Sequence, residues 1–517
     1  MAWTKARLEE VARTRLRGAR LVVVANREPY IHVHDGEDVR WMKPASGLTT
    51  ALDPVMQACG GAWVGHGSGD ADRQEADDHG RLGVPPDAPT YTLRRVWLTK
   101  EEEQGYYYGF ANEALWPLCH AAYTRPRFDP ADWEQYRCVN QKFADAVLEE
   151  TAGGPAVVFV QDYHFALLPR LLKKARADLV VMQFWHIPWP NREIFRVCPW
   201  KEEILDGLLG NDQLSFHIQY HCNNFLDTVE RFLESRVDME HFAVDRGGHT
   251  TYVRPHPISI DPEAVAAFPP EELEKEQERL RKQFRLHDRT LLVGVERVDY
   301  TKGIPDRFHA VDRLLTLHPE LKRRFCFVQV GAPSRTHIPT YRRLNDELHA
   351  LVEEINWRHG DDDWRPIIHI NEHYDMQQVH ALYRMATGCV VSSLHDGMNL
   401  VAKEFVASRT DLHGVLVLSR FTGAARELSD AVLINPYAVD EFAEALHIAL
   451  TMPVEEQERR MRRLRAQVAD NNVFRWAGML LSEAGKLVEV VYADAPVGSD
   501  REAGNGLSNG FAAGTAV

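Results

Sequence analysis

Residues 395–405, HDGMNLVAKEF, join a predicted strand to a predicted helix and thereby indicate the fold. The preceding residues 388–394, GCVVSSL, are typical of a buried parallel strand, and helical periodicity follows Asn399. The first N–H groups of a helix lack intrahelical partners and carry partial positive charge, so this turn suits an anion such as a diphosphate. Glu404 can then accept hydrogen bonds from sugar hydroxyls. The simpler alternative is that Asp396 and Asn399 only cap the helix.

The composition indicates a soluble globular protein of two or three domains. The chain has 517 residues, 44% of them hydrophobic, and a formal net charge of −15. This acidity argues against nucleic acid or an anionic membrane as the main partner. No signal peptide or membrane span is recognisable, and the seven cysteines form no C-x-x-C pair. We therefore expect a cytoplasmic protein whose thiols are reduced and mostly lie in the core.

Strands alternate with helices in two successive series, which predicts an α/β fold of two doubly wound domains. In the first series, apolar runs at 21–25, 157–160 and 180–185 each end in polar residues, at the sheet edge where such folds bind ligands. The second series begins at 291–295. Residues 60–69 contain five glycines and indicate a loop.

The first strand of the second series is followed by two cations, Arg297 and Lys302. Both can reach one diphosphate around a turn, Arg297 as a planar fork and Lys302 as a point charge. The alternative is salt bridges to Glu296 or Asp299. His369 and His373 have no third ligand at a known spacing, so we expect no metal.

These motifs together resemble the retaining glycosyltransferases of the trehalose-6-phosphate synthase family, over about residues 20–490. The resemblance implies a GT-B fold, in which two Rossmann-like domains face a cleft and the last helix crosses back to the first domain. It implies an acceptor-binding domain at 19–262, a nucleotide-sugar-binding domain at 263–475 and a crossover helix at 476–492. The composition of 493–517, rich in Gly, Ala, Ser and Asn, indicates a disordered tail. The matching motifs are Asn26-Arg27, Leu115-Trp116-Pro117, Asp162-Tyr163-His164, His186-Ile187-Pro188, Glu296 to Gly303, Ser334-Arg335 and Asp396 to Glu404.

The resemblance also implies roles for individual residues. Catalysis would fall to Arg297, Lys302, Asp396 and His186. The choice of acceptor anomer would depend on Trp116 and Ile187, and the acceptor phosphate and sugar would be bound by Arg27, Tyr107, Asp162 and Arg335. The donor would be bound by Ser46, Gly47, Arg297, Lys302, Tyr374, Leu400, Val401, Ala402, Lys403 and Glu404.

The implied reaction transfers glucose from a nucleotide-glucose donor to glucose 6-phosphate and yields α,α-trehalose 6-phosphate. A leaving diphosphate needs positive charge more than it needs a protein base, and preorganised cations can supply it. No cofactor or metal is expected, and a homo-oligomer is the family expectation. The nucleobase of the donor is left open.

Two departures from the family pattern keep alternatives open. Ser46-Gly47 stands where the family usually has Gly-Gly, and His66 replaces the second aromatic of a W-x-G-W pattern. The stretches around Arg27 and Ser46 also look like glucosylglycerol-phosphate synthases, which use glycerol 3-phosphate. We favour the sugar-phosphate acceptor because Arg27, Tyr107 and Arg335 are all present. A non-catalytic sugar-phosphate sensor is less favoured because the donor cations are retained, and a dehydrogenase is disfavoured by the lack of G-x-G-x-x-G after the first strand.

Overall fold

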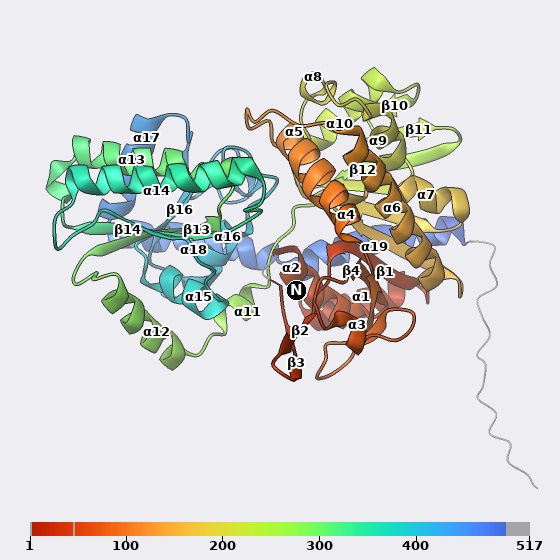
Figure 1. Cartoon of the computed structure of the whole chain (residues 1–517), viewed down its shortest axis with the longest axis horizontal. Helices are drawn as coiled ribbons and strands as arrows, with labels where there is room; N and C mark the ends of the chain where they lie inside the picture. Colours follow the sequence, from red (N-terminus) through yellow and green to blue (C-terminus); the bar gives the residue numbers. More distant parts are fainter. Residues whose placement is uncertain (1–2, 45–46, 493–517) are drawn as a thin grey trace, which may run out of the picture.

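The computed structural model describes residues 3–44 and 47–492, which form two lobes (Figure 1). Each lobe is built on its own sheet, with helices packed on the faces of that sheet. Ser46 and the tail at 493–517 lie outside the described residues, so the expectations for them remain predictions.

The first lobe contains a ten-stranded sheet with the order β10-β11-β12-β9-β8-β7-β1-β4-β6-β5. Its strands are β1 (Arg20–Arg27), β4 (Ala62–His66), β5 (Arg81–Val84), β6 (Tyr91–Val96), β7 (Ala156–Gln161), β8 (Val180–Phe184), β9 (Gln213–Phe216), β10 (Arg236–Asp238), β11 (Ala243–Arg246) and β12 (His249–Pro255). A separate hairpin consists of β2 (Ile31–Asp35) and β3 (Asp38–Met42). The α-helices are α1 (Lys5–Arg15), α2 (Gly47–Cys59), α3 (Asp72–Glu75), α4 (Lys100–Glu103), α5 (Trp116–His120), α6 (Pro130–Thr151), α7 (Leu168–Ala175), α8 (Arg192–Phe195), α9 (Lys201–Leu208) and α10 (Gln219–Phe232).

The second lobe contains a six-stranded parallel sheet with the order β15-β14-β13-β16-β17-β18. Its strands are β13 (Thr290–Arg297), β14 (Phe325–Ala332), β15 (Ile367–Ile370), β16 (Gly388–Val391), β17 (Val415–Ser419) and β18 (Val432–Ile434). The remaining helices are α11 (Pro262–Ala266), α12 (Pro270–Gln283), α13 (Ile304–Leu317), α14 (Pro339–His359), α15 (Met376–Met385), α16 (Leu400–Ser408), α17 (Val439–Thr451), α18 (Val454–Asp470) and α19 (Val473–Val491).

The central strands are apolar because they are covered on both faces. Strands β7, β8, β16 and β17 are buried along their whole length, as expected for parallel strands between helix layers. The predicted strands of the first series lie in β1, β7 and β8, and the second series begins with β13. The α/β fold class predicted from the sequence is therefore confirmed.

Helix α19 follows the second lobe in the sequence but packs against the first lobe. The ring of Trp476 lies 6.0 Å from that of Phe159 in β7 and 5.3 Å from that of Phe184 in β8, measured between centroids. Helix α19 also packs along α1. The end of the chain thus crosses back to the sheet with which the chain began.

Two segments differ from what their sequence suggests. The prediction of a loop at 60–69 is wrong in its middle, because residues 62–66 form β4 beside β1 in the sheet. Glycine is required at position 61, directly before β4, because a Cβ there would lie only 2.1 Å from the carbonyl oxygen of Leu21. Residues 104–115 form a π-helix, a rare geometry that is frequent at functional sites.

None of the described helices combines the length and apolarity needed to cross a bilayer. All seven cysteines lie in described residues; five are buried, Cys59 is partly buried and Cys138 is exposed. These burial classes agree with the prediction that most of the thiols lie in the core.

We predict that Gly61→Ala destabilises the first lobe. The φ of Gly61 is +97°, a left-handed value that costs an alanine free energy, and the added methyl would collide with backbone. The free energy of unfolding should fall by roughly 2–4 kcal/mol. The control is Gly153→Ala, whose Cβ would meet nothing within 4 Å. Urea denaturation measures both changes, and equal stability of the two variants would contradict the prediction.

Candidate active site

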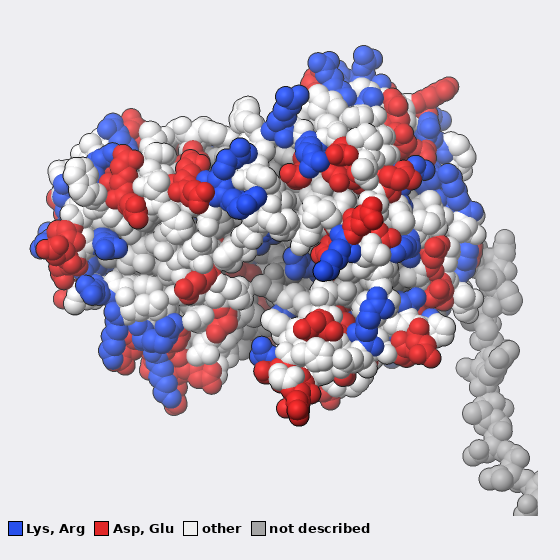
Figure 2. Space-filling view, in the orientation of Figure 1, with Lys and Arg blue, Asp and Glu red and all other residues white. Residues whose placement is uncertain are grey.

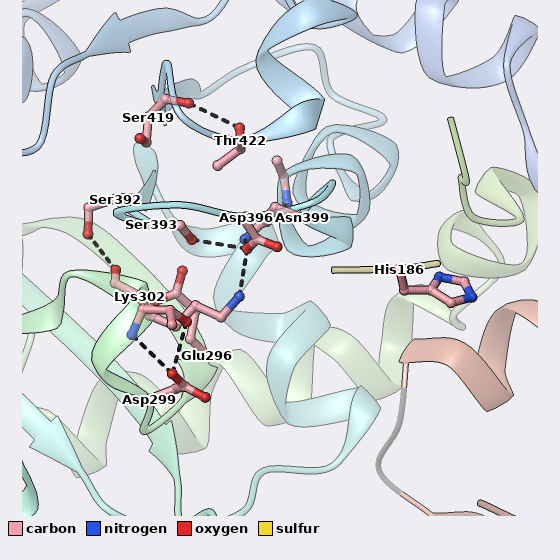
Figure 3. Close-up of polar contacts among 12 residues, drawn as sticks. His186, Glu296, Asp299, Lys302, Ser392, Ser393, Asp396, Asn399, Ser419 and Thr422 are labelled. Carbon is pink, nitrogen blue, oxygen red and sulfur yellow. Dashed lines mark hydrogen bonds and ion pairs between the residues drawn. The ribbon is translucent and has the colours of Figure 1, made fainter. Parts of the chain in front are cut away.

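A salt bridge joins the two turns that follow β13 and β16 in the second lobe (Figure 3). The Nζ of Lys302 lies 2.6 Å from Oδ2 of Asp396. The same carboxylate oxygen accepts hydrogen bonds from Ser393 Oγ at 3.1 Å and Asn399 Nδ2 at 3.2 Å. Burial alone would raise the pKa of Asp396, but Lys302 and Asn399 hold it well below its usual range. Asp396 is therefore an ionised acceptor and not a helix cap.

The first amides of α16 point out of the helix beside this pair. Asn399 is the N-cap, and its Oδ1 accepts from the amide of Ala402 at 3.1 Å. The amides of Leu400 and Val401 precede the first full turn and therefore have no intrahelical acceptor. Anion binding by these amides remains a prediction.

Arg297, the last residue of β13, is exposed and forms no hydrogen bond or salt bridge within the described residues. Its guanidinium carbon lies 5.9 Å from the ring centre of Trp116, which belongs to the first lobe. The neighbouring Glu296 is instead paired with the buried Arg307 at 2.9 Å. A guanidinium whose nitrogens have no hydrogen-bond or salt-bridge partner in the described chain thus lies next to the Lys302 turn.

Glu404 is positioned on α16, one turn beyond the free amides. It makes no hydrogen bond or salt bridge with the described part of the chain, and burial raises its pKa to about 7. A half-buried carboxylate without a protein partner can accept hydrogen bonds from ligand hydroxyls. Tyr374, predicted to contact the nucleobase through its backbone, follows β15, and its hydroxyl accepts a hydrogen bond from Gln283 at 3.3 Å.

The side chain of Lys403 is buried and bonded to other parts of the protein. Its Nζ donates to the carbonyl oxygen of Ile258 at 2.8 Å and to Oε2 of Glu427 at 2.5 Å. Ile258 belongs to the segment that connects the two lobes, and Lys403 is 1% exposed. Lys403 therefore fastens α16 to the connection between the lobes, and only its backbone is placed to meet a ligand.

The first lobe contributes a second group of polar side chains at the ends of its strands. Arg27, at the end of β1, donates from Nη2 to the hydroxyl of Tyr107 in the π-helix at 3.4 Å. Burial alone would raise the pKa of Tyr107, but Arg335 and Arg27 outweigh burial and lower it to about 8. The ring of Tyr107 stacks on His164 at 5.7 Å.

Arg335 reaches from the second lobe to the same place. Its guanidinium carbon lies 4.4 Å above the ring of Trp116, and its Nη1 donates to the hydroxyl of Tyr341 at 2.5 Å. Asp299 accepts from Arg335 at 3.5 Å and from the Tyr341 hydroxyl at 3.2 Å. Trp116 is thus covered by two arginines of the opposite lobe.

Asp162 and His186 follow β7 and β8. Oδ1 of Asp162 accepts from the amide of His186 at 3.1 Å, and burial raises the pKa of Asp162 to about 7 although amides, that of Ile187 among them, hydrogen bond to it. The His186 ring bonds to Oε1 of Gln161 at 2.9 Å, and burial lowers its pKa to about 3, so it is neutral. Figure 3 shows the His186 ring lying apart from the Lys302–Asp396 pair.

The loop after β16 touches the first lobe directly. Nδ1 of His395 lies 2.8 Å from the carbonyl oxygen of His120. A Cβ on Gly397 would meet the carbonyl oxygen of His186 at 2.1 Å, and one on Gly47 would lie 3.4 Å from Cδ1 of Leu400. On the face shown in Figure 2, the surface is hollowed between the two lobes.

The structure therefore brings together most of the residues singled out in the sequence. The described residues predicted to bind the donor come from the second lobe, except Gly47 at the start of α2. Arg335 also comes from the second lobe, and the other residues predicted to bind the acceptor or select its anomer come from the first. Sequence reasoning missed Asp299 and Tyr341, which hold Arg335. The sequence suggested Asp299 only as a salt-bridge partner of Arg297 or Lys302, and no pattern distinguishes Tyr341 from the other residues of α14. Among the described residues, no cluster of three metal-ligating side chains lies at this site.

Sequence and structure comparisons show which known proteins this chain resembles. The profile of Glycosyltransferase family 20 matches residues 19–486. The chain is 37% identical over 472 residues to a trehalose-6-phosphate synthase of Mycobacterium avium strain 104, covering 89% of this chain and 94% of that protein. It resembles a UDP-forming α,α-trehalose-phosphate synthase of Burkholderia xenovorans solved in complex with glucose-6-phosphate, with a TM-score of 0.80, 30% identity, and coverage of 90% of this chain and 100% of that chain. A structure from E. coli described as bound with UDP-2-fluoro glucose matches with a TM-score of 0.80 and 30% identity, covering 90% and 99%.

We predict that Lys403→Met destabilises the protein, because it leaves Glu427 and the Ile258 carbonyl without their partner. Removing one member of a buried ion pair costs roughly 3–5 kcal/mol of unfolding free energy. Combining it with Glu427→Gln should recover part of that loss. Chemical denaturation of both single variants and the double variant gives the coupling free energy. A strictly additive double variant would contradict the pairing.

Glu404 should make the stability of the unliganded protein depend on pH. Its pKa is raised from 4.5 to about 7, so the folded protein binds a proton that the unfolded chain has released. The unfolding free energy should therefore fall as the pH rises from about 4.5 to about 7, by at most about 1.4 kcal/mol per pH unit. The unfolding free energy of Glu404→Gln should fall less steeply over this pH range, whereas that of the exposed control Glu271→Gln should fall as the wild type does. The slope that remains comes from other buried carboxyls with raised pKa values, such as Asp162. Parallel curves for all three proteins would reject the prediction.

Proposed function

The chain belongs to glycosyltransferase family 20, and we propose that it is a retaining glucosyltransferase that forms α,α-trehalose 6-phosphate from a nucleotide-glucose donor and glucose 6-phosphate. The observation that carries this proposal is the arrangement around Trp116. The guanidinium carbons of Arg297 and Arg335 lie 5.9 and 4.4 Å from the centre of its ring, and Arg335 and Arg27 both lower the pKa of Tyr107. Two anionic groups can thus be held within one hollow.

We assign the diphosphate of the donor to Arg297, Lys302 and the amides of Leu400 and Val401. Arg297 is free to turn toward the ligand, whereas Lys302 is already oriented by Asp396. Glu404 is assigned to the ribose hydroxyls, because it is the carboxylate on α16 that has no partner in the described chain. Asp396 and His186 are assigned to the glucose of the donor.

We assign the phosphate of the acceptor to Arg27 and Arg335, with Tyr107 and Asp162 beside it. The assignment rests on the position of both arginines beside Tyr107: Arg335 and Arg27 lower the pKa of its hydroxyl more than any other charged group does. Trp116 and Ile187 are assigned to the choice of acceptor anomer, since both are buried at the junction of the lobes.

The chemistry follows from the charges. As the bond between C1 of glucose and the diphosphate oxygen breaks, negative charge grows on the diphosphate, where the arginine, the lysine and the helix amides stabilise it. The C1 hydroxyl of the acceptor attacks from the same face, and its proton passes to an oxygen of the leaving diphosphate. No nucleophilic carboxylate is needed. The remaining rate enhancement comes from holding the two sugars close together in a reactive orientation.

The experiment that tests the proposal measures nucleotide release with glucose 6-phosphate and, separately, glycerol 3-phosphate. UDP-, ADP- and GDP-glucose are each offered as donors, and the sugar product is identified. We expect trehalose 6-phosphate, and the related enzymes described as UDP-forming support UDP-glucose as the first donor to test. Turnover with glycerol 3-phosphate alone would reassign the chain to glucosylglycerol-phosphate synthesis. Binding without turnover would favour a sensor. Cytoplasmic location and a homo-oligomeric state remain predictions.

Arg297→Ala should lower kcat roughly a hundred- to thousand-fold, the usual loss for one preorganised stabiliser of transition-state charge. Folding should be little affected, because the exposed side chain of Arg297 forms no hydrogen bond or salt bridge within the described residues. Arg297→Lys should lie between wild type and alanine, since lysine keeps the charge but loses the planar fork. The control is Arg462→Ala, an exposed arginine of α18. Steady-state rates and thermal melting distinguish the effects, and a near-normal rate would remove Arg297 from the site.

A further inference from the structure

Two histidines and a glutamate meet on the outer side of the second lobe, where α13 and α17 lie side by side (Figure 1). His318 is the C-cap of α13, and Glu444 and His447 stand one turn apart on α17. Their ligand atoms all lie within 4.8 Å of one another. The cluster belongs to no part of the site already described.

His318 is bonded through both ring nitrogens. Nε2 lies 3.0 Å from Oε1 of Glu444, and Nδ1 lies 3.2 Å from Oε1 of Glu320. Ionised carboxylates only accept, so both nitrogens donate. The Nε2 hydrogen of His318 therefore lies between Nε2 and Oε1 of Glu444, and both of these atoms can ligate a divalent metal in its place. Glu320 then holds the other nitrogen, as outer carboxylates do for histidines bound to zinc.

His447 completes the group. Its ring stacks on that of His318, with centroids 3.8 Å apart and an interplanar angle of 14°. Its Nδ1 lies 3.9 Å from Oε2 of Glu444. Tetrahedral bonds of about 2.0–2.2 Å place ligand atoms roughly 3.3–3.6 Å apart. A metal lies in the plane of each imidazole that binds it, so the partly exposed His447 ring must turn out of the stack to share an ion with His318. All three side chains are partly exposed, which leaves a fourth position for water.

We propose that His318, Glu444 and His447 bind a divalent transition metal ion of the zinc class, with Glu320 orienting His318. Imidazole and carboxylate together favour zinc, cobalt or nickel over magnesium or calcium. The C-terminal end of α13 adds partial negative charge beside the ion. The same helix begins directly after Lys302, and its 14 residues span about 21 Å. The ion would therefore clamp the far end of α13 to α17 without entering the active site.

The test uses the full chain stripped of metal by chelation. Zn²⁺ binding is measured by calorimetry, and Co²⁺ binding by its visible absorption. We expect one saturable Zn²⁺ site of micromolar affinity, weakened at least tenfold in His447→Ala and in Glu444→Gln. The matched control is His413→Ala, which removes an exposed histidine that lies 3.6 Å from Glu458 and is outside the cluster. This control should bind Zn²⁺ as the wild type does.

Two further measurements, of the melting temperature and of the rate of nucleotide release, distinguish binding at this cluster from binding elsewhere. Zn²⁺ should raise the melting temperature of the wild type and of His413→Ala but not that of His447→Ala. The rate of nucleotide release should be the same with and without Zn²⁺, because the cluster lies far from the transfer site. Absence of saturable binding below millimolar Zn²⁺, or equal binding by His447→Ala and wild type, would overturn the proposal.

Discussion

The ion pair between Lys302 and Asp396 is the interaction on which the donor side of the molecule depends. It connects the turns after two neighbouring strands, and each side chain is 14% exposed. Taking two charges out of water costs free energy that a single pair often fails to recover, so the pair is better understood as a positioning device than as a source of stability. Asn399 bonds to the same carboxylate and also caps α16. One network therefore sets both the place of the ammonium and the direction of the first amides of the helix.

Close backbone approach at glycine is the second constraint, because it lets this network touch the opposite lobe. Gly397 lies against the carbonyl oxygen of His186, and a Cβ on Gly423 would meet the carbonyl oxygen of Gly397 at 2.0 Å. Three segments thus stack with no room for a side chain between them. Lys403 adds a bond from α16 to the connection between the lobes. Positions of the donor residues and of the first lobe are consequently linked through main-chain contacts, which any relative movement of the lobes must change.

Much of this arrangement could be predicted from the sequence because parallel strands bring their carboxyl ends to one edge. That rule groups Arg27 with Asp162 at the edge of the first sheet, and Arg297 with the 395–405 turn at the edge of the second. Only the resemblance to the family predicted that the two edges face each other. The rule could not give side-chain direction: Lys403 is one of the residues predicted to bind the donor, yet its buried ammonium donates to the carbonyl oxygen of Ile258. Nor could it find β4, where glycines mark close backbone contact inside a sheet and not a loop, or the π-helix, whose hydrogen bonds leave no periodic signature. The supports of Arg335 were missed because they come from separate turns and helices that meet only in three dimensions.

The effect of burial explains why arginine and lysine, rather than histidine, are the residues that we assign to the anionic groups. Burial lowers the pKa of His120, His186 and His221 to about 3, so these rings are neutral and serve as hydrogen-bonding and packing groups. An imidazole in this environment offers no lasting positive charge to a phosphate. Guanidinium groups keep their charge at any physiological pH. Lys302 keeps its charge for another reason: burial alone would lower its pKa, but the neighbouring carboxylates of Asp396 and Glu296 outweigh burial and raise it. The cations proposed to meet the diphosphate therefore stay charged, whereas these buried histidines are neutral.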